Sequence, residues 1–161
     1  MDRVYIGLGG NLGGPGKSIR GALDKMEAEG LCRVLQVSSF YSTEPVGIKD
    51  QPWFINAAAI IETDFSPAEL IKAFARIERD FGRPEERIKN GPRPLDIDIL
   101  LWEDRVIKDN GLVIPHPGMR KRRFVLEPLS EIAPDIRHPE TGETAAQMLS
   151  ALDDPSAVRK A

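Results

Sequence analysis

Apolar residues in this chain form strand-like runs and helix-like stripes in the order strand, helix, strand, strand, helix, strand. The strand-like runs cover residues 4–8, 31–41, 53–63 and 95–102, and the helical stripes begin at Ser18 and Ser66. The two middle runs follow one another without a helix between them, so they can pair as antiparallel neighbours. This order predicts an α+β fold, a ferredoxin-like sandwich with an antiparallel-rich sheet and helices on one face. We expect residues 1–161 to form a single domain.

The helix that begins after Ser66 has the strongest local signal. Ser66 can cap it, Pro67 suits its first turn, and Glu69 can complete a capping box. Its core stripe is predicted to consist of Leu70, Ile71, Phe74, Ile77 and Phe81. Weaker signals predict a first helix ending near residue 30, a turn at 110–111 and a final short helix within 141–152.

Composition narrows the class of protein. The formal net charge of −3 argues against a general nucleic-acid binder, which usually presents a strongly basic domain. Cys32 is the only cysteine and cannot form an internal disulfide, and residues 1–3 lead into a short strand rather than a signal-peptide core. No apolar run approaches the roughly 20 residues that span a bilayer. We therefore expect a cytoplasmic protein that binds neither nucleic acid nor membrane.

The glycine-rich stretch at residues 7–16 invites a nucleotide-binding interpretation, but its spacing fails. A P-loop needs a glycine five positions before Gly16, and Asn11 stands there. A dinucleotide fingerprint starting at Gly7 needs its third glycine where Leu12 stands. A tight structural turn is favoured, in which Asn11 could help to position a substrate loop.

Two aspartates on alternate positions follow an arginine held in a Gly/Pro turn. Asp96 and Asp98 share one face of a strand, roughly 7 Å apart along the backbone, and that face continues with Leu100 and Trp102. The alternative is the solvent face of an edge strand, where polar residues alternate normally. Paired carboxylates repel unless a cation lies between them, and magnesium with phosphates is the usual solution. Arg93 offers a planar fork to phosphate oxygens.

Other basic residues surround this pair. Arg83, Arg87 and Lys89 precede it and residues 120–123 follow it, although at least half of such charges usually form a solvated face. The 120–123 cluster is predicted to be a structured turn. His116 could donate to a phosphate or stabilise its own turn, and a zinc site is disfavoured because the chain has only two histidines.

Asn56 lies on an otherwise apolar strand face. Phe54 shares that face, and Ala58 and Ile60 continue it. A buried amide without partners costs about 1–3 kcal/mol, so Asn56 either bonds to backbone in the core or reads the edge of a ligand. In the second case the ligand is a flat heterocycle, with Phe54 and Phe124 stacking on it.

These segments together resemble the 6-hydroxymethyl-7,8-dihydropterin pyrophosphokinase family. The resemblance covers nearly the whole chain and lies in residues 5–12, 39–45, 50–58, 91–98 and 115–116, of which Gly91-Pro92-Arg93-Pro94-Leu95-Asp96-Ile97-Asp98 is the most specific motif. It implies transfer of pyrophosphate from ATP to the hydroxymethyl group of the pterin, with release of AMP, in folate biosynthesis.

The resemblance also implies roles for individual residues. Asp96 and Asp98 would hold two magnesium ions, with Asp96 also facing the attacking hydroxyl and Arg83 and Arg93 completing the catalytic set. The ATP site would comprise Glu78, Arg83, Lys89, Arg93, His116 and Arg122. The pterin site would comprise Thr43, Glu44, Val46, Phe54, Asn56, Asp96 and Phe124. The chain departs from the family's commoner form at Glu85, Lys89, Asn90, Gly111 and Pro117.

Two other functions stay open at this stage. A non-catalytic ferredoxin-like module could bind a small ligand or partner without magnesium. An ordinary kinase could transfer a single phosphate, although the missing P-loop weakens that alternative. The family resemblance favours a monomeric enzyme that uses ATP and the pterin as substrates.

Overall fold

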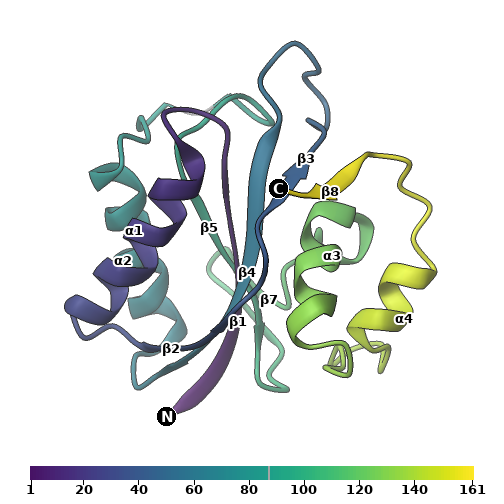
Figure 1. The fold of residues 1–161 in the computed structure, drawn as a ribbon. Coiled ribbons are helices and arrows are strands. Elements are labelled where there is room, and N and C mark those ends of the chain that lie inside the picture. The colour runs from purple at the N-terminus through teal and green to yellow at the C-terminus, as the bar shows by residue number, and fades with distance from the viewer. Residues whose placement is uncertain (87) are drawn as a thin grey trace.

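The computed structural model describes residues 1–86 and 88–161, so Arg87, one of the basic residues named above, lies outside the described residues. An antiparallel sheet lies between two layers of helices (Figure 1). Its strand order is β5-β1-β4-β3-β8, and β2 also pairs with β4. The bounds are β1 Asp2–Gly10, β2 Arg33–Val37, β3 Tyr41–Thr43, β4 Phe54–Thr63, β5 Asp96–Trp102 and β8 Val158–Lys160. A separate hairpin consists of β6 Ile107–Asp109 and β7 Leu112–Ile114.

Helices cover both faces of the sheet, which corrects the expected one-sided arrangement. Helices α1 (Pro15–Ala28) and α2 (Pro67–Asp80) cover one face. Helices α3 (Arg123–Ile132) and α4 (Ala145–Ser150) cover the other, after a 3-10 turn at Met119–Lys121. The α+β sandwich itself is confirmed.

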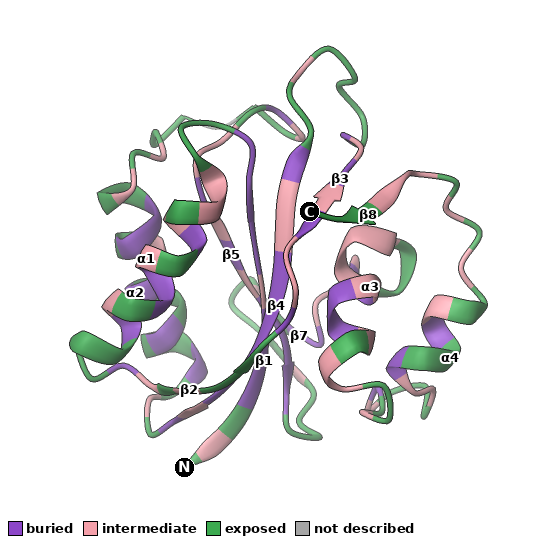
Figure 2. Cartoon of the chain, in the orientation of Figure 1, coloured by how far each residue is buried: buried purple, intermediate pink, exposed green. Residues whose placement is uncertain are grey.

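The first helical layer forms as the sequence indicates. The capping box of α2 is present, with Glu69 N donating to Ser66 Oγ at 3.2 Å and Ser66 N donating to Glu69 Oε1 at 3.0 Å. Leu70, Phe74 and Ile77 are buried against the sheet, as the purple inner face of α2 shows in Figure 2. The placement of Ile71 in this stripe is wrong, because it is 39% exposed and borders a cavity.

In the second layer, α3 was not predicted from the sequence, whereas α4 lies within the short helix expected at residues 141–152. Leu126 and Leu129 of α3 and Met148 of α4 pack against Ala58 and Leu100 of the sheet. The structured turn expected at residues 120–123 is confirmed in part by the 3-10 turn. Pro128 lies inside α3 and removes one backbone donor, so the local pattern argues against a helix that tertiary burial nevertheless stabilises.

A bulge in β5 separates the aspartates from Trp102. Tyr5 pairs with Leu101 and Ile6 pairs with Ile99, so Leu100 is an extra residue in the ladder. Leu100 and Leu101 therefore both join the core beneath α3, while Trp102 turns to the core beneath α1 and α2. The expectation that Asp96, Asp98, Leu100 and Trp102 share one face is wrong only for Trp102.

The remaining predictions agree with the structure in outline. The predicted strand 31–41 is divided into β2 and β3, and both pair antiparallel with β4. Asn110 and Gly111 form the hairpin turn, both with positive φ, and α4 lies within 141–152. Among residues 1–86 and 88–161, no helix combines the length and apolar character that crossing a bilayer requires.

Candidate active site

Two glycines of β1 form an open floor on the sheet face beneath α3. Gly9 pairs with Asn56 on one side and with Asp96 on the other, and Gly7 pairs in the same way with Ala58 and Asp98. A Cβ atom added at Gly9 would lie 2.2 Å from Asn56 Oδ1. The absence of a side chain there lets the Asn56 amide and the two carboxylates face the same space, a cavity of about 20 Å³. In the sequence these glycines were considered only as part of a nucleotide-binding loop, and their role as a floor was overlooked, although their alternation along a strand was a usable signal.

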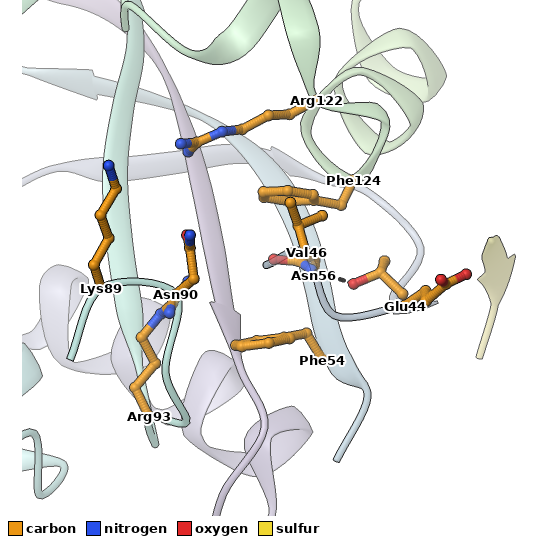
Figure 3. A pocket seen from close by; sticks show the side chains of 10 residues that line it. Glu44, Val46, Phe54, Asn56, Lys89, Asn90, Arg93, Arg122 and Phe124 are labelled. Atoms are coloured by element: carbon orange, nitrogen blue, oxygen red, sulfur yellow. Dashed lines mark hydrogen bonds between the residues drawn. The ribbon is translucent and has the colours of Figure 1, made fainter. Parts of the chain in front are cut away.

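A larger cavity of about 290 Å³ opens beside this floor. Phe54 and Phe124 lie on opposite sides of it with the Asn56 side chain between them (Figure 3). Asn56 Nδ2 donates to Thr43 Oγ1 at 2.7 Å, so its partner is a neighbouring hydroxyl rather than core backbone. Among the described residues no donor reaches Asn56 Oδ1. The lining residues are Thr43, Glu44, Val46, Phe54, Asn56, Lys89, Asn90, Arg93, Arg122 and Phe124.

Two arginines hold Asp96 from different sides. Arg83 Nη1 lies 2.5 Å from Asp96 Oδ1, and Arg93 Nε lies 3.5 Å from Asp96 Oδ2. Arg83 also lies 3.2 Å from Glu78 Oε2, which in turn accepts a hydrogen bond from Ile97 N at 2.8 Å. This network fixes both the carboxylate and the strand that carries it.

The Arg93 guanidinium is positioned by an aromatic ring of the first cavity and by the backbone of its own turn. It lies over the Phe54 ring, 4.8 Å from the centroid, and donates from Nη1 to Gly91 O at 2.9 Å. Its Nε is buried and makes no hydrogen bond with any residue that the structure describes. A cation held this way at the cavity wall can accept an anionic ligand with little loss of side-chain entropy.

Asn11 connects the end of β1 to two loops of the site. Its Nδ2 donates to Gln51 Oε1 at 3.0 Å and to Pro52 O at 2.8 Å, and its Oδ1 accepts from Arg93 N at 2.9 Å. Gln51 Nε2 donates onward to Asn90 O at 2.7 Å. The geometry agrees with the role inferred for Asn11 in positioning a loop.

A second cavity of about 350 Å³ lies on the other side of the aspartates. It combines acidic groups at one end with apolar side chains of α2 and β7. His116 lines it and accepts from Gly118 N through Nδ1 at 3.0 Å, so it stabilises its own turn while facing the cavity. Burial, and then the Arg122 charge, lower the pKa of His116, which keeps the ring neutral at pH 7. The lining residues are Ile71, Phe74, Ala75, Glu78, residues 96–99, residues 111–114, His116 and Pro117.

The Asp98 carboxyl is buried close to two other acidic groups, Asp96 and Glu78. Burial, then the nearby Asp96 and Glu78 charges, raise its pKa to about 7 against the weaker opposing effect of Arg122 and Arg93. Among the described residues no group of three or more His, Cys, Asp or Glu side chains could hold a metal. Two carboxylates with phosphate oxygens and water are nevertheless the usual ligands of magnesium, so Asp96 and Asp98 fit that ion.

The residues predicted to bind the pterin lie together, whereas those predicted to bind ATP are divided between the two larger cavities. All seven residues assigned to the pterin border the first cavity or the small floor cavity. Of those assigned to ATP, Glu78 and His116 line the second cavity, whereas Lys89, Arg93 and Arg122 line the first. Arg83 lies behind Asp96. The Gly111–Ile114 wall and the exposed position of Ile71 were overlooked in the sequence because they depend on how the hairpin folds back.

Comparison with known proteins identifies close relatives. The sequence model of the family described as 7,8-dihydro-6-hydroxymethylpterin-pyrophosphokinase matches residues 5–134. The 2-amino-4-hydroxy-6-hydroxymethyldihydropteridine pyrophosphokinase of Methylorubrum extorquens is 42% identical over 160 residues, which cover 99% of both chains. The protein of the same name from Pseudomonas aeruginosa is 40% identical over 94% of this chain and 92% of its own.

Longer relatives contain a region similar to this chain. The folic acid synthesis protein fol1 of Schizosaccharomyces pombe is 43% identical over 92% of this chain but only 20% of its own length. The solved structure of Plasmodium falciparum HPPK-DHPS superposes with a TM-score of 0.68 at 15% identity, over 93% of this chain and 43% of that one. At that identity the superposition shows a shared fold.

The raised pKa of Asp98 predicts a specific dependence of stability on pH. Its folded-state pKa of about 7 exceeds the ordinary value of 3.8, so the folded state binds more protons between pH 4 and 7. The Asp98 contribution to the free energy of unfolding therefore falls as pH rises through that window. In metal-free buffer, the stability of Asp98→Asn relative to the parent should rise by on the order of 1–2 kcal/mol from pH 5 to pH 8.

Urea denaturation at the two pH values measures this difference. The exposed Asp109 offers a matched control, since Asp109→Asn should show the same pH dependence as the parent protein. A stability difference for Asp98→Asn that does not change with pH would contradict the assignment.

Proposed function

Because the chain belongs to the 7,8-dihydro-6-hydroxymethylpterin pyrophosphokinase family, we propose that its two cavities hold the two substrates of that reaction, the pterin in the first and ATP in the second. The protein is an ATP-dependent diphosphotransferase of folate biosynthesis, moving pyrophosphate from ATP to the hydroxymethyl group of the pterin. The observation that carries the assignment of the cavities is the floor at Gly7 and Gly9, where Asn56 and the aspartates face the space between them.

The first cavity suits a flat heterocycle with polar edges. Phe54 and Phe124 can cover the two faces of the ring (Figure 3). The Asn56 amide can pair with an edge that has both a donor and an acceptor, and its orientation is set by Thr43. Backbone groups of Thr43, Glu44 and Val46 would meet the remaining edge. The hydroxymethyl group would then point across Gly9 toward Asp96.

The second cavity and the basic residues beside it suit a nucleotide triphosphate. The apolar wall of β7 and α2 would receive the base, with Glu78 and His116 at its border. The triphosphate would run from there past the aspartates toward Lys89, Arg93 and Arg122. The transferred phosphates must reach the pterin, so cations that line the first cavity are consistent with this path. Arginine forks and lysine point charges suit phosphate oxygens.

Asp96 and Asp98 would hold magnesium, and we propose two ions. Bound there, magnesium would neutralise phosphate charge and align the β-phosphorus with the hydroxyl, which is most of what phosphoryl transfer requires of a protein. Arg83 and Arg93 hold Asp96 at the position facing that hydroxyl, so the carboxylate does not have to reorganise. The hydroxyl oxygen bonds to the β-phosphorus and gives up its proton to solvent. The bond between the β-phosphorus and the oxygen that bridges to the α-phosphorus breaks, and AMP leaves with that oxygen.

We propose that residues 1–161 act as a single domain and a monomer.

The product of the reaction tests the proposal. Protein mixed with ATP, magnesium and 6-hydroxymethyl-7,8-dihydropterin should yield AMP and the pterin diphosphate, detected by chromatography and phosphorus NMR. Asp98→Asn should reduce magnesium-dependent turnover by at least 100-fold while circular dichroism remains unchanged. ADP as the product would indicate a single-phosphate kinase. Pterin binding without turnover and independent of magnesium would indicate a binding module.

A substitution at the glycine floor tests the pterin cavity. Gly9→Ala should weaken pterin binding by at least tenfold, because its new Cβ would lie 2.2 Å from Asn56 Oδ1 and displace the amide. Gly7→Ala is the matched variant, since the atoms nearest to its Cβ would be side-chain atoms of Leu100 at 3.6 Å or more, an ordinary van der Waals contact. Calorimetric titration with the pterin measures both, and equal affinities in the two variants would refute the role given to Asn56.

A further inference from the structure

We propose that residues 154–159 form a clamp that fixes the two walls of the first cavity relative to one another and thereby sets the affinity for the pterin. This inference rests on the proposed function, because it assumes that the first cavity binds the pterin. The segment lies beyond residues 5–134, which match the family's sequence model. In Figure 1 its strand, β8, lies at the edge of β3 beside α3.

One end of the clamp holds the loop at residues 44–53. Strand β8 pairs with β3, Val158 opposite Thr43, and the pairing continues into the loop. Glu44 N donates to Ala157 O at 2.9 Å, and Ala157 N donates back to Glu44 Oε2 at 3.1 Å. The Arg159 guanidinium lies over the Trp53 ring, 5.6 Å from the centroid. Residues 157–159 therefore contact both the first residue of the loop and its far end.

The Glu44 carboxylate links this contact to the loop interior. It also accepts from Lys49 Nζ at 3.3 Å, and the same ammonium group donates to Pro45 O at 2.8 Å. The hydrogen bond from Ala157 and the Lys49 charge lower the pKa of Glu44, so the group stays ionised and keeps both partners. Glu44 itself lines the first cavity, and the contact therefore reaches the cavity wall.

The other end of the clamp holds the first turn of α3. Asp154 Oδ2 accepts from Arg123 N at 3.2 Å, and Asp154 Oδ1 accepts from Ser156 N at 2.9 Å. Arg123 is the first residue of α3 and stands between Arg122 and Phe124, both of which line the first cavity. Burial raises the pKa of Asp154, but the hydrogen bonds from Ser156 and Arg123 outweigh it and the pKa is lowered.

The two ends are only three residues apart. Pro155 restricts the backbone between them, and the turn at Asp154 and Ser156 fixes its direction. The wall that carries Phe124 and the wall that begins at Glu44 are therefore joined by a short, hydrogen-bonded connection. Helix α3 also packs against the sheet through Leu126 and Leu129, so the fold does not depend on the clamp. Releasing either end should alter the spacing of the walls and leave the second cavity unchanged.

Two variants release the two ends separately. A chain that stops after Ser156 lacks the contacts to Glu44 and Trp53, and Asp154→Ala lacks the contact to α3. The neighbouring Asp153 is exposed and makes no hydrogen bond or ion pair with any described residue, so Asp153→Ala is the matched control. Asp154→Asn keeps one acceptor oxygen and should restore part of the lost affinity.

Binding is measured by calorimetric titration of 6-hydroxymethylpterin into protein saturated with magnesium and α,β-methylene ATP, which cannot undergo the transfer. Each release variant should bind the pterin about tenfold more weakly, while affinity for the ATP analogue should fall by a clearly smaller factor, because of the residues assigned to ATP only Arg122 lies on the clamped walls. Because a clamp fails when either end is free, the combined variant should be no weaker than the worse single variant. Asp153→Ala should match the parent.

Three results would overturn the clamp. They are parent-like pterin affinity in both release variants, equal loss of affinity for the ATP analogue, and additive losses in the combined variant. The last would mean two independent local contacts. Failure of the proposed function would appear differently, since the parent protein itself would not bind the pterin. Thermal unfolding followed by circular dichroism verifies that each variant is folded.

Discussion

The pairing of Gly9 with both Asn56 and Asp96 is the constraint on which the candidate site depends. It places an amide from β4 and a carboxylate from β5 on either side of a strand position that has no side chain. Any larger residue would occupy the space through which the two groups face each other, as the 2.2 Å contact of a Cβ at Gly9 shows. Because neighbouring strands are held by backbone hydrogen bonds, this arrangement is as rigid as the sheet itself.

Charge is distributed unequally over this rigid frame. Asp96 is held by Arg83 and Arg93, whereas among the described residues Asp98 has no basic group within ion-pair distance. The first carboxylate is thereby oriented and the second is left with a raised pKa. Such an arrangement is costly for a folded protein without a ligand, since a buried charge without a partner disfavours the folded state. A cation bound beside Asp98 would relieve that cost.

Local signals predicted the parts of the fold that local chemistry determines. The capping box at Ser66 and Glu69, the turn at residues 110–111 and the spacing of Asp96 and Asp98 were each readable from a few neighbouring residues. The bulge in β5 could not be read in this way, because it arises from the register with β1. Strand β8 is three residues long and exists only because β3 offers an edge to pair with. Helix α3 contains Pro128 and is stabilised by burial rather than by its propensity.

The same distinction applies to the site. The residues that the family resemblance implied do line the cavities or lie beside them, but their division between the two cavities depends on where the loops return to the sheet. Lys89 and Arg122 come from different segments and come together at the first cavity only in three dimensions (Figure 3). The positions at which this chain departs from the commoner family form all lie in loops or turns: Glu85, Lys89, Asn90, Gly111 and Pro117.

The central residues of the candidate site are therefore fixed by strand pairing, whereas the residues around them are fixed by contacts between loops. Asn56, Asp96 and Asp98 lie on paired strands, where a substitution in a loop cannot shift their spacing by much. Loop residues line the walls of the cavities proposed to bind the substrates, and Asn11 and Gln51 tie two of those loops to the sheet and to each other. Changes at the loops should therefore alter substrate affinity more than the alignment of the reacting atoms, because alignment is determined by the sheet.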